Sequence, residues 1–461
     1  MANAGGSKDR RVFGQCLASA GATILITQTG IMGGWTSPNM ARLTGENATI
    51  PLSLEEASWV ASCLNLGRFV SVVLVPMLID LAGSKRTILL SFVPVSVGWI
   101  TMMLANSALW LCVARFLSGI TYGLAYGCFS IYLAEVSVAT LRGTFISVAM
   151  IGWPMGTLLG TIAETYLPMS VSSGLYLAQC LLGMALLAWL PESPQHLVRA
   201  KDSEGARKAF GWYRGGIEAE VDAELSAIAK IVESSAQMDG GLASRVQRLA
   251  SGRVRKSLLL VVALFSLQQM CGLFDVEFYM ETILTKARLF LIEPREAVIW
   301  ANLVLLVATV ISVNLLDKLG RRPLLVASSL GVALAMAGLG LHFQLFGRSD
   351  VEAGSVPQWL PLASIALFTV TFTAGFMSVP STVLSEIFPA DLKGSAACVC
   401  SLTSALFGFL ASKSYLPTVE AVGEAYVFWA HAALSALAAP VALFLMPETR
   451  GKSLQEIQAS L

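Results

Sequence analysis

Charged residues near the ends of long apolar segments follow a pattern that occurs twice. A glutamate is followed seven residues later by a basic residue, at Glu135 and Arg142 and again at Glu386 and Lys393. Carboxylate and basic groups at neighbouring helix ends can pair and separate again, because a charge at a membrane edge is stable only when it is paired or hydrated. The chemistry that this pattern predicts is therefore reversible ion pairing rather than bond making.

Two further patterns are duplicated about half a chain apart. Residues 80–86 (DLAGSKR) are echoed by 317–323 (DKLGRRP), and residues 191–193 (PES) by 447–449 (PET). A repeated membrane unit with charged corners is typical of a transporter rather than an ordinary enzyme. The alternative is that the charges only anchor the helix ends, but anchoring would not require the same glutamate-to-basic spacing in both halves.

Composition places the chain in a lipid bilayer. Of its 461 residues, 55% are hydrophobic and only 13% are charged, whereas about a quarter of the residues of a soluble domain are charged. The net charge of +1 suggests no nucleic-acid partner. No nucleophile–base pair and no metal-ligand spacing is visible, so we expect no enzyme activity, no cofactor and no metal. The expected partners are a small-molecule substrate and the lipid bilayer, with no obligate protein partner evident.

The apolar segments are long enough for twelve membrane spans, since about 20 residues cross a bilayer as a helix. The predicted spans are 12–34, 57–80, 86–105, 109–133, 143–167, 172–191, 257–284, 297–316, 323–346, 360–385, 394–416 and 425–446.

Basic residues in the short loops indicate the orientation of the spans. Lysines and arginines cluster after spans two, four, eight and ten, which share one side if the spans alternate. That side is predicted to be cytoplasmic, together with both termini. Lys286, Arg288 and Arg295 fall on the opposite side. Asn47, the start of the only N-glycosylation sequon, also falls there and is a candidate glycosylation site.

The polar stretch between spans six and seven divides the chain. We predict a first six-helix bundle at 1–191, a linker at 192–256, a second bundle at 257–446 and a tail at 447–461. Apolar residues recur at helical spacing within the linker, from Val221 to Val232 and from Leu242 to Leu249. This spacing predicts short amphipathic helices beneath the membrane; the alternative is a solvated linker.

Glycines four residues apart predict close packing of two spans. Span four carries Gly119, Gly123 and Gly127, and span five carries the series Gly152 to Gly160. Small residues at this spacing let helix backbones approach within a membrane. The pattern is compatible with a helix that slides against its neighbour and equally with static packing.

The motifs, taken in order, resemble those of the sugar porter family of the major facilitator superfamily over essentially the whole chain. Those that carry the resemblance are 80–86, 115–119 (RFLSG), 135–143, 191–194, 268–272 (QQMCG), 317–323, 386–394 and 447–451. Residues 35–38 (WTSP) and Gly375-Phe376 are most similar to the insect facilitated trehalose transporter branch. The resemblance implies an all-α polytopic fold of twelve transmembrane helices in two pseudo-symmetric six-helix bundles, with a cytoplasmic helical linker and the substrate near the midplane.

Gln268 and Gln269 match the family's pair of sugar-binding glutamines in span seven. Gln268 lies eleven residues into its span, which at about 1.5 Å per residue is about 17 Å deep and near the midplane. A primary amide offers two donors and an acceptor, which suits a polyol. The alternative is a helix-to-helix hydrogen bond between the bundles.

Other positions depart from the family pattern. Met150, Phe274, Ser381 and Ser404 stand where the family has polar or aromatic sugar ligands, so they are candidate pocket residues with fewer hydrogen bonds to offer. Each lost hydrogen bond is worth about 1 kcal/mol. The altered pocket keeps a second hypothesis open: a carrier of a non-sugar solute, or a receptor-like homologue that does not transport.

Two acidic residues appear just beyond the glutamines. Asp275 and Glu277 are candidates for binding a cation, carrying a proton or contacting a substrate amine, because a carboxylate within a membrane is often functional; simple hydration near the outer surface is the alternative. Span one lacks the aspartate of the proton-coupled members, which favours facilitated diffusion unless one of these acids replaces it.

The sequence therefore predicts a facilitative carrier for trehalose or a hexose in the plasma membrane, working by alternating access. Its inner gate is predicted to be a latch of charged residues at the cytoplasmic corners: Asp80, Lys85, Arg86, Arg115, Glu135, Arg142, Glu192, Asp317, Arg321, Arg322, Glu386, Lys393 and Glu448.

Overall fold

The structure is a computed structural model. It describes residues 3–46, 48–214, 221, 225–226, 228, 248–249, 251–347, 357–449 and 456. Asn47, Val232, Leu242 and Val246 lie outside the described residues, and so does the side chain of Asp317.

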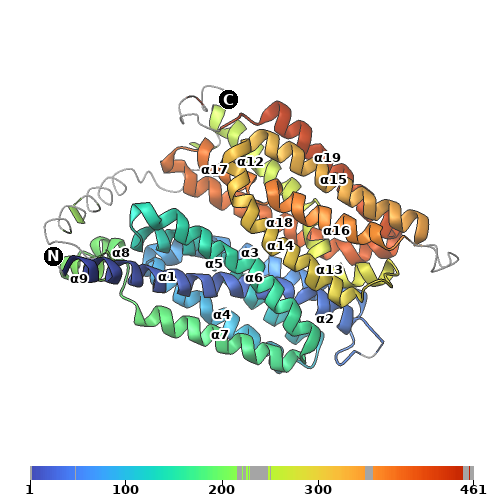
Figure 1. Cartoon of the computed structure of the whole chain (residues 1–461), viewed down its shortest axis with the longest axis horizontal. Helices are drawn as coiled ribbons and strands as arrows, with labels where there is room; N and C mark the ends of the chain where they lie inside the picture. The colour runs from blue at the N-terminus through green and yellow to red at the C-terminus, as the bar shows by residue number, and fades with distance from the viewer. Residues whose placement is uncertain are drawn as a thin grey trace.

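Twelve helical spans long and apolar enough to cross a membrane are present in the described part of the chain, as predicted. Most begin or end a few residues beyond the predicted limits. The first and last turns of a helix are often polar, so a prediction from runs of apolar residues does not include them. The first six form one bundle, at the bottom of Figure 1. Its helices are α1 (Asn3–Gly34), α2 (Thr36–Leu43), α3 (Leu54–Ala82), α4 (Ser84–Met103), α5 (Ala108–Val136), α6 (Ala139–Tyr166) and α7 (Met169–Trp189).

The other six spans form the second bundle, at the top of Figure 1. Three of its spans comprise more than one helical segment, which the hydropathy pattern did not predict; span twelve is α19 followed by η3. Span seven comprises α12 and α13, and span ten comprises α16, η2 and α17. The segments are α12 (Gly252–Gln269), α13 (Leu273–Lys286), α14 (Pro294–Leu319), α15 (Arg321–Phe346), α16 (Trp359–Thr371), η2 (Phe372–Phe376), α17 (Val379–Ile387), α18 (Ala390–Val422), α19 (Glu424–Pro440) and η3 (Val441–Leu445).

The break in span seven has a local cause. Gly272 adopts a φ of 88°, in the left-handed region. A side chain at that conformation would be strained, so glycine permits the turn between α12 and α13. The turn comes directly after Gln269, and it therefore places the glutamine pair at the end of a half-helix in the middle of the span.

Close helix packing in the first bundle confirms the glycine prediction. A Cβ added to Gly119 would lie 1.9 Å from the carbonyl oxygen of Leu64 on α3, and one added to Gly156 would lie 2.1 Å from that of Thr27 on α1. The α3–α5 and α1–α6 pairs are accordingly the main packing contacts of this bundle.

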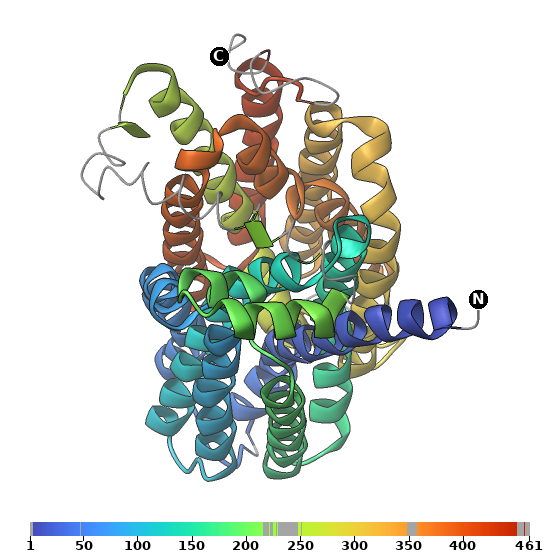
Figure 2. The ribbon, with the colours of Figure 1, turned by 90° about the vertical axis from the view of Figure 1, so that its left-hand side faces the viewer.

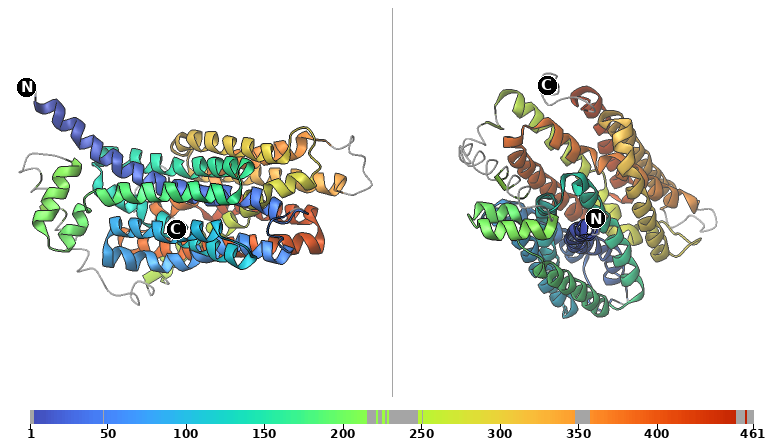
Figure 3. Two further views of the ribbon diagram at one scale, coloured as in Figure 1. Left: turned by 90° about the horizontal axis from the view of Figure 1, so that it is seen from below. Right: turned by 60° about the vertical axis from the view of Figure 1, so that its left-hand side comes forward.

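Two short helices of the linker cross one end of the first bundle (Figures 2 and 3). They are α8 (Pro194–Arg199) and α9 (Ser203–Arg214). Tyr213 of α9 is buried, and its hydroxyl donates to the carbonyl oxygen of Pro191 at 2.8 Å, while its own carbonyl accepts from Gln15 at 3.0 Å. Burial raises the pKa of this phenol, which keeps it neutral and able to donate. The linker is thus helical where it leaves the first bundle.

Candidate functional site

We call the end of the molecule that carries Gly83, Glu135, Gly320 and Glu386 the corner end, and the opposite end the far end. The corner end also carries α8 and α9, on the left of Figure 1, whereas α2 and α13 meet at the far end on the right. These two names do not say which end faces the cytoplasm.

Gln268 is held by a carbonyl that a proline has left without a partner. Pro380 has no N–H, so it cannot donate to Phe376, four residues earlier in span ten. The Gln268 side-chain amide donates to that carbonyl oxygen at 2.6 Å and to the Met377 carbonyl at 3.3 Å. The amide therefore makes a helix-to-helix hydrogen bond, but within the second bundle rather than between the bundles.

Gln269 keeps an open acceptor. Its amide nitrogen donates to the Gln268 side-chain oxygen at 3.1 Å, while its own Oε1 is buried and has no hydrogen-bond partner in the described part of the chain. A buried acceptor without a partner is costly, since almost all such atoms are satisfied in native proteins. A hydroxyl of a bound solute would satisfy it.

The four other predicted pocket residues fall in different surroundings. Phe274 is buried against Phe278, with 5.1 Å between ring centroids, and it covers Gly408 on α18. Met150 is half-buried on α6. Ser381 is exposed and bonds to its own helix, at the Ser378 carbonyl. Ser404 is buried and accepts a hydrogen bond of 2.8 Å from Arg68 of the first bundle.

Arg68 is a polar residue that the sequence analysis missed. It lies at the centre of α3, which runs from Leu54 to Ala82, and its guanidinium carbon lies 5.3 Å from the centroid of the Tyr122 ring. A single arginine midway along an apolar span was the signal that could have found it, because such charges are rare and face the interior of a helix bundle.

Polar contacts join the two bundles in their far halves. Asn65 of α3 donates to Ser412 of α18 at 3.3 Å, and Lys413 donates to Ser58 at 2.7 Å. The other two such contacts are Asn302 of α14 with Thr161 of α6, at 2.9 Å, and the Glu281 N–H with Ser37 of α2, at 2.9 Å. All these residues lie in the half of their span that is nearer the far end, so the bundles are fastened to one another there.

Arg115 does not belong to the corner latch, and that part of the prediction is wrong. It lies near the beginning of α5, whereas Glu135 lies at the end of the same helix. Twenty residues of α-helix separate the two by about 30 Å. Arg115 is buried at the far end, where it donates to the carbonyl of Met32 at 2.6 Å and to the hydroxyl of Thr36 at 2.8 Å.

The corner network of the first bundle centres on Glu135. Its carboxylate accepts hydrogen bonds from the hydroxyls of Ser84 and Ser193, and Lys85 donates to the carbonyl of Leu190. Arg86 pairs with Glu192 at 3.2 Å. The duplicated motifs of this half therefore meet at one corner, as their positions at helix ends predicted.

The second bundle repeats this arrangement with a stronger partner. Glu386 pairs with Arg321 at 2.8 Å and accepts from the Thr449 hydroxyl at 2.5 Å. Glu448 accepts from the N–H groups of Arg321 and Arg322 at 3.2 and 3.1 Å. Thr449 thus matches Ser193, while Arg321 stands where the first bundle has Ser84. Glu386 has a charged partner in this position, and Glu135 has a hydroxyl.

The remaining corner residues, Asp80, Arg142 and Lys393, make fewer hydrogen bonds and ion pairs with the described residues. Asp80 is exposed and makes no ion pair with the residues that the structure describes. Arg142 and Lys393 are half-buried, and the Nε atom of Arg142 has no hydrogen-bond partner in the same part of the chain. The Arg86–Glu192 and Arg321–Glu386 ion pairs each lie within one half of the chain, so neither joins the two corner networks.

This asymmetry leads to a testable difference between the two corners. We expect Glu386→Gln to lower the free energy of unfolding by about 1–3 kcal/mol, because it leaves a partly buried arginine without its carboxylate. Glu135→Gln should cost less, about 0.5–1 kcal/mol, since a neutral amide can still accept from two hydroxyls. Thermal unfolding of the purified variants measures both, and equal shifts would contradict the expectation.

Asp275 is buried, contrary to the alternative that it is simply hydrated. It pairs with His431 of α19, with 2.5 Å between Oδ2 and Nε2. The other ring nitrogen of His431 lies 2.8 Å from the Met270 carbonyl oxygen, beside the break in span seven. With Nδ1 donating to that carbonyl, Nε2 and Asp275 share one proton. The Asp275–His431 pair therefore stabilises the turn between α12 and α13. No pattern in the sequence indicated that these two residues are in contact.

Glu277 points in another direction, toward the first bundle. A Cβ added to Gly33 of α1 would lie 2.4 Å from its Oε1. The carboxylate is half-buried, and it makes no hydrogen bond or ion pair with any residue in the described ranges. Arg115 and Arg68 lie within electrostatic range of it.

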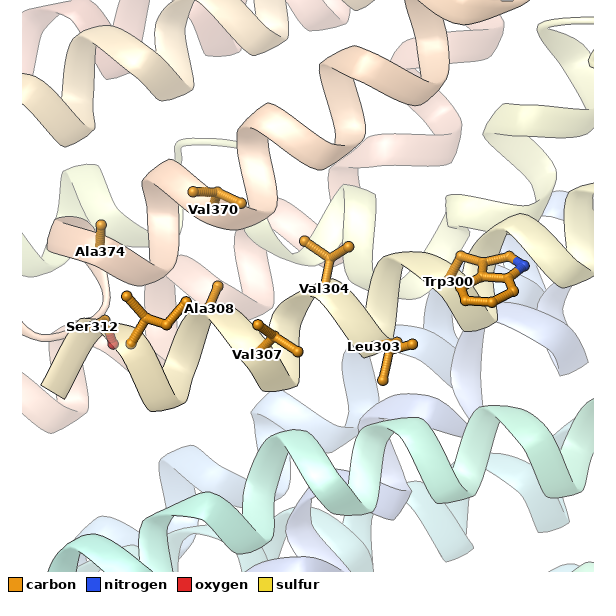
Figure 4. A pocket seen from close by; sticks show the side chains of 9 residues that line it. Trp300, Leu303, Val304, Val307, Ala308, Ser312, Val370 and Ala374 are labelled. Carbon is orange, nitrogen blue, oxygen red and sulfur yellow. The ribbon is translucent and has the colours of Figure 1, made fainter.

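A separate groove on the outside of the second bundle is apolar (Figure 4). Ser312 supplies the hydroxyl among its lining residues, and two of the others, Trp300 and Ile311, are 60% and 57% exposed. A polyol there would leave most of its hydroxyls without partners, so this groove is not the candidate site. Its lining residues are Trp300, Leu303, Val304, Val307, Ala308, Ile311, Ser312, Val370 and Ala374.

Two six-span bundles, fastened in their far halves and carrying polar side chains at mid-span, define a multi-pass membrane protein of the two-bundle type. The model of the "Sugar (and other) transporter" family matches residues 15–461, so the chain belongs to that family, which is one of transporters and not of enzymes.

Curated relatives agree with this assignment, and a solved structure agrees with the fold. The chain is 30% identical to a facilitated trehalose transporter Tret1 of Polypedilum vanderplanki, covering 98% of this chain and 88% of that protein. It is 28% identical to the Tret1 of Aedes aegypti, covering 98% of this chain but only about half (55%) of that protein. An inward-open structure of the E. coli xylose transporter XylE is similar in fold, with a TM-score of 0.75 at 20% identity over 97% of this chain and 98% of XylE.

Proposed function

We propose that this protein is a facilitative carrier of a sugar, trehalose or a hexose, that works by alternating access in the plasma membrane. The curated relatives named above are trehalose transporters, and the family is one of sugar and other transporters. The observation that carries the proposal is the Oε1 of Gln269 at the break in span seven, which has no hydrogen-bond partner among the described residues, because a sugar hydroxyl is the donor that such an acceptor needs.

The corner end is proposed to be cytoplasmic, with both termini there. The basic loops after spans two, four, eight and ten support this orientation. With the far halves of the bundles fastened together, the state described here would then be closed toward the outside. Transport requires the bundles to separate at the far end and approach at the corner end, where pairing between the two corner networks would hold the inner gate shut.

A second candidate function is favoured by the loss of polar ligands. Phe274 is buried in apolar contact and Ser381 bonds to its own helix, so neither offers what the sugar porters use. A carrier of a non-sugar solute, proton-coupled or not, or a receptor-like homologue fits these changes. Uptake of labelled trehalose and glucose into proteoliposomes separates the candidates. Saturable uptake that ignores a pH gradient supports the facilitative carrier, and no uptake of either by folded protein contradicts it.

The two glutamines should respond differently to removal of their side chains. Gln269→Ala removes the open acceptor and should raise the KM for the sugar about ten-fold while leaving the fold intact. Gln268→Ala leaves the Phe376 carbonyl without a donor, so it should also lower the free energy of unfolding by about 1–3 kcal/mol. Uptake kinetics and thermal unfolding measure both effects. Unchanged sugar uptake in both variants would contradict the proposed role of the amides.

A further inference from the structure

Four polar side chains lie at the interface of the two bundles: Arg68, Tyr122 and Ser404 at mid-span, and Glu277 in the half of span seven nearer the far end. Arg68 and Tyr122 are the central residues of α3 and α5, which run from 54 to 82 and from 108 to 136. Arg68 bonds across the bundle interface to Ser404, and Glu277 of the second bundle lies against Gly33 of the first. The cluster therefore contains residues of both bundles, so its geometry changes when the bundles move relative to one another.

The cluster has unused hydrogen-bonding groups. The guanidinium of Arg68 donates one N–H to Ser404 and carries four further N–H donors. The Glu277 carboxylate makes no hydrogen bond or ion pair within the ranges that the structure describes. Arg68, Tyr122 and Glu277 are all half-buried, so each has accessible surface within its membrane span.

The geometry provides a donor, an acceptor and a ring. Arg68 lies 5.3 Å from the centroid of the Tyr122 ring, and that ring stacks on Tyr126 at 4.9 Å. Arg68 and Tyr122 are both within electrostatic range of Glu277. A carboxylate that accepts from hydroxyls, a guanidinium that donates to them and an aromatic face are the groups that bind a sugar ring. Charged hydrogen-bonding groups bind more strongly than neutral ones.

We propose that Arg68, Tyr122 and Glu277 form the recognition site for a neutral polyhydroxy solute, and that they replace the hydrogen bonds and stacking that Phe274, Ser381 and Ser404 do not supply. The inference rests on the proposed function. An anionic solute would meet the Glu277 carboxylate and a cationic one the Arg68 guanidinium, so the pair selects against a net charge of either sign. Binding between them also draws the two bundles together around the solute.

The test uses full-length protein in proteoliposomes and compares competitors of different charge. Uptake of labelled trehalose or glucose is competed with glucose, with glucosamine as the cation and with glucuronate as the anion. For the wild type, the neutral sugar should compete best. Arg68→Gln and Glu277→Gln should each raise the KM for the neutral sugar at least about ten-fold. Arg68→Gln should favour glucosamine over glucuronate, and Glu277→Gln should favour glucuronate over glucosamine.

Two further variants keep the result interpretable. Gly33→Ala would place a Cβ 2.4 Å from the Glu277 oxygen, so it should weaken sugar affinity by displacing the carboxylate while removing no charge. Arg295→Gln is the matched control, because Arg295 pairs with Glu293 at the far end and is 50% exposed; its uptake should equal that of the wild type. Size-exclusion profiles and thermal unfolding verify that each variant is folded.

The outcomes separate the two proposals. Normal uptake by the wild type, with KM values of Arg68→Gln and Glu277→Gln within about two-fold of it, overturns this inference alone. A change of KM without opposite changes in charge preference also overturns it, since a merely structural role would act that way. Absence of sugar uptake by the folded wild type overturns the proposed function and this inference together.

Discussion

Gly119→Ala is expected to lower the free energy of unfolding by about 3 kcal/mol or more and to abolish transport. The added Cβ would lie 1.9 Å from the Leu64 carbonyl oxygen and 2.9 Å from the backbone nitrogen of Arg68. These are backbone atoms of a neighbouring helix, so no side-chain rotation relieves the clash and α3 must move away from α5. That movement also displaces Arg68, which binds Ser404 of the other bundle.

Two other helical glycines with less restrictive surroundings provide the controls. Gly123→Ala meets mainly the hydroxyl of Ser71, at 1.7 Å, and a serine side chain can rotate, so its effect should be smaller. Gly174→Ala on α7 meets nothing within 4 Å and should be neutral or stabilising by up to about 1 kcal/mol, since alanine is the better helix former. Thermal unfolding in detergent and uptake measure the series. Similar stability of the Gly119 and Gly174 variants would contradict the close approach of α3 and α5.

Arg115→Met is expected to cost about 3 kcal/mol of unfolding free energy and most of the transport rate. The guanidinium donates to the Met32 carbonyl and the Thr36 hydroxyl. A hydrogen bond from a charged group contributes about 1.5–3 kcal/mol. The hydrogen bond of 3.0 Å from the Thr36 hydroxyl to the Met32 carbonyl remains. The guanidinium carbon of Arg115 also lies 5.2 Å from the centroid of the Trp35 ring and 5.5 Å from that of the Phe278 ring. Phe278 belongs to α13, so the substitution removes a contact between the bundles at the far end.

A lysine at this position should rescue only part of the loss. Arg115→Lys keeps the charge, but an ammonium group lacks the planar fork that reaches two acceptors at once. Arg295→Met removes an exposed arginine and should change stability by less than about 1 kcal/mol. Unfolding curves and initial uptake rates distinguish the three variants. An Arg115→Met protein as stable as the Arg295→Met protein would show that the buried contacts at the far end contribute little.

The twelve spans were predictable because a bilayer imposes one rule on every segment that crosses it: about 20 apolar residues in a row. The duplicated corners were predictable for a similar reason. Glu135 and Glu386 recur with fixed neighbours, and helix ends at one side of a membrane are brought together by the alternation of the spans alone. Ser193 and Thr449 accordingly meet these glutamates as hydroxyl donors.

Arg115 shows where this kind of reasoning fails. The motif at 115–119 was grouped with the corner motifs by charge, but the direction in which α5 runs places it near the opposite end of the helix from Glu135. Counting residues from the loop before span four would have corrected the assignment. Arg68 is hidden for a simpler reason: one charge at the centre of α3 leaves the mean hydropathy of its span at 1.8, which is still apolar enough to cross a membrane.

The sequence by itself determined the spans, the duplication and the residue types at each corner, because these depend on local hydropathy and on position along the chain. Only the tertiary structure decided which partner each polar group has. The Gln268 amide donates to the Phe376 carbonyl, to which Pro380 cannot donate. Asp275 pairs with His431. Glu277 lies against Gly33 of the other bundle. These partners come from helices that are far apart in the chain, and a hydrogen bond depends on distance and direction, which no spacing along one helix can specify.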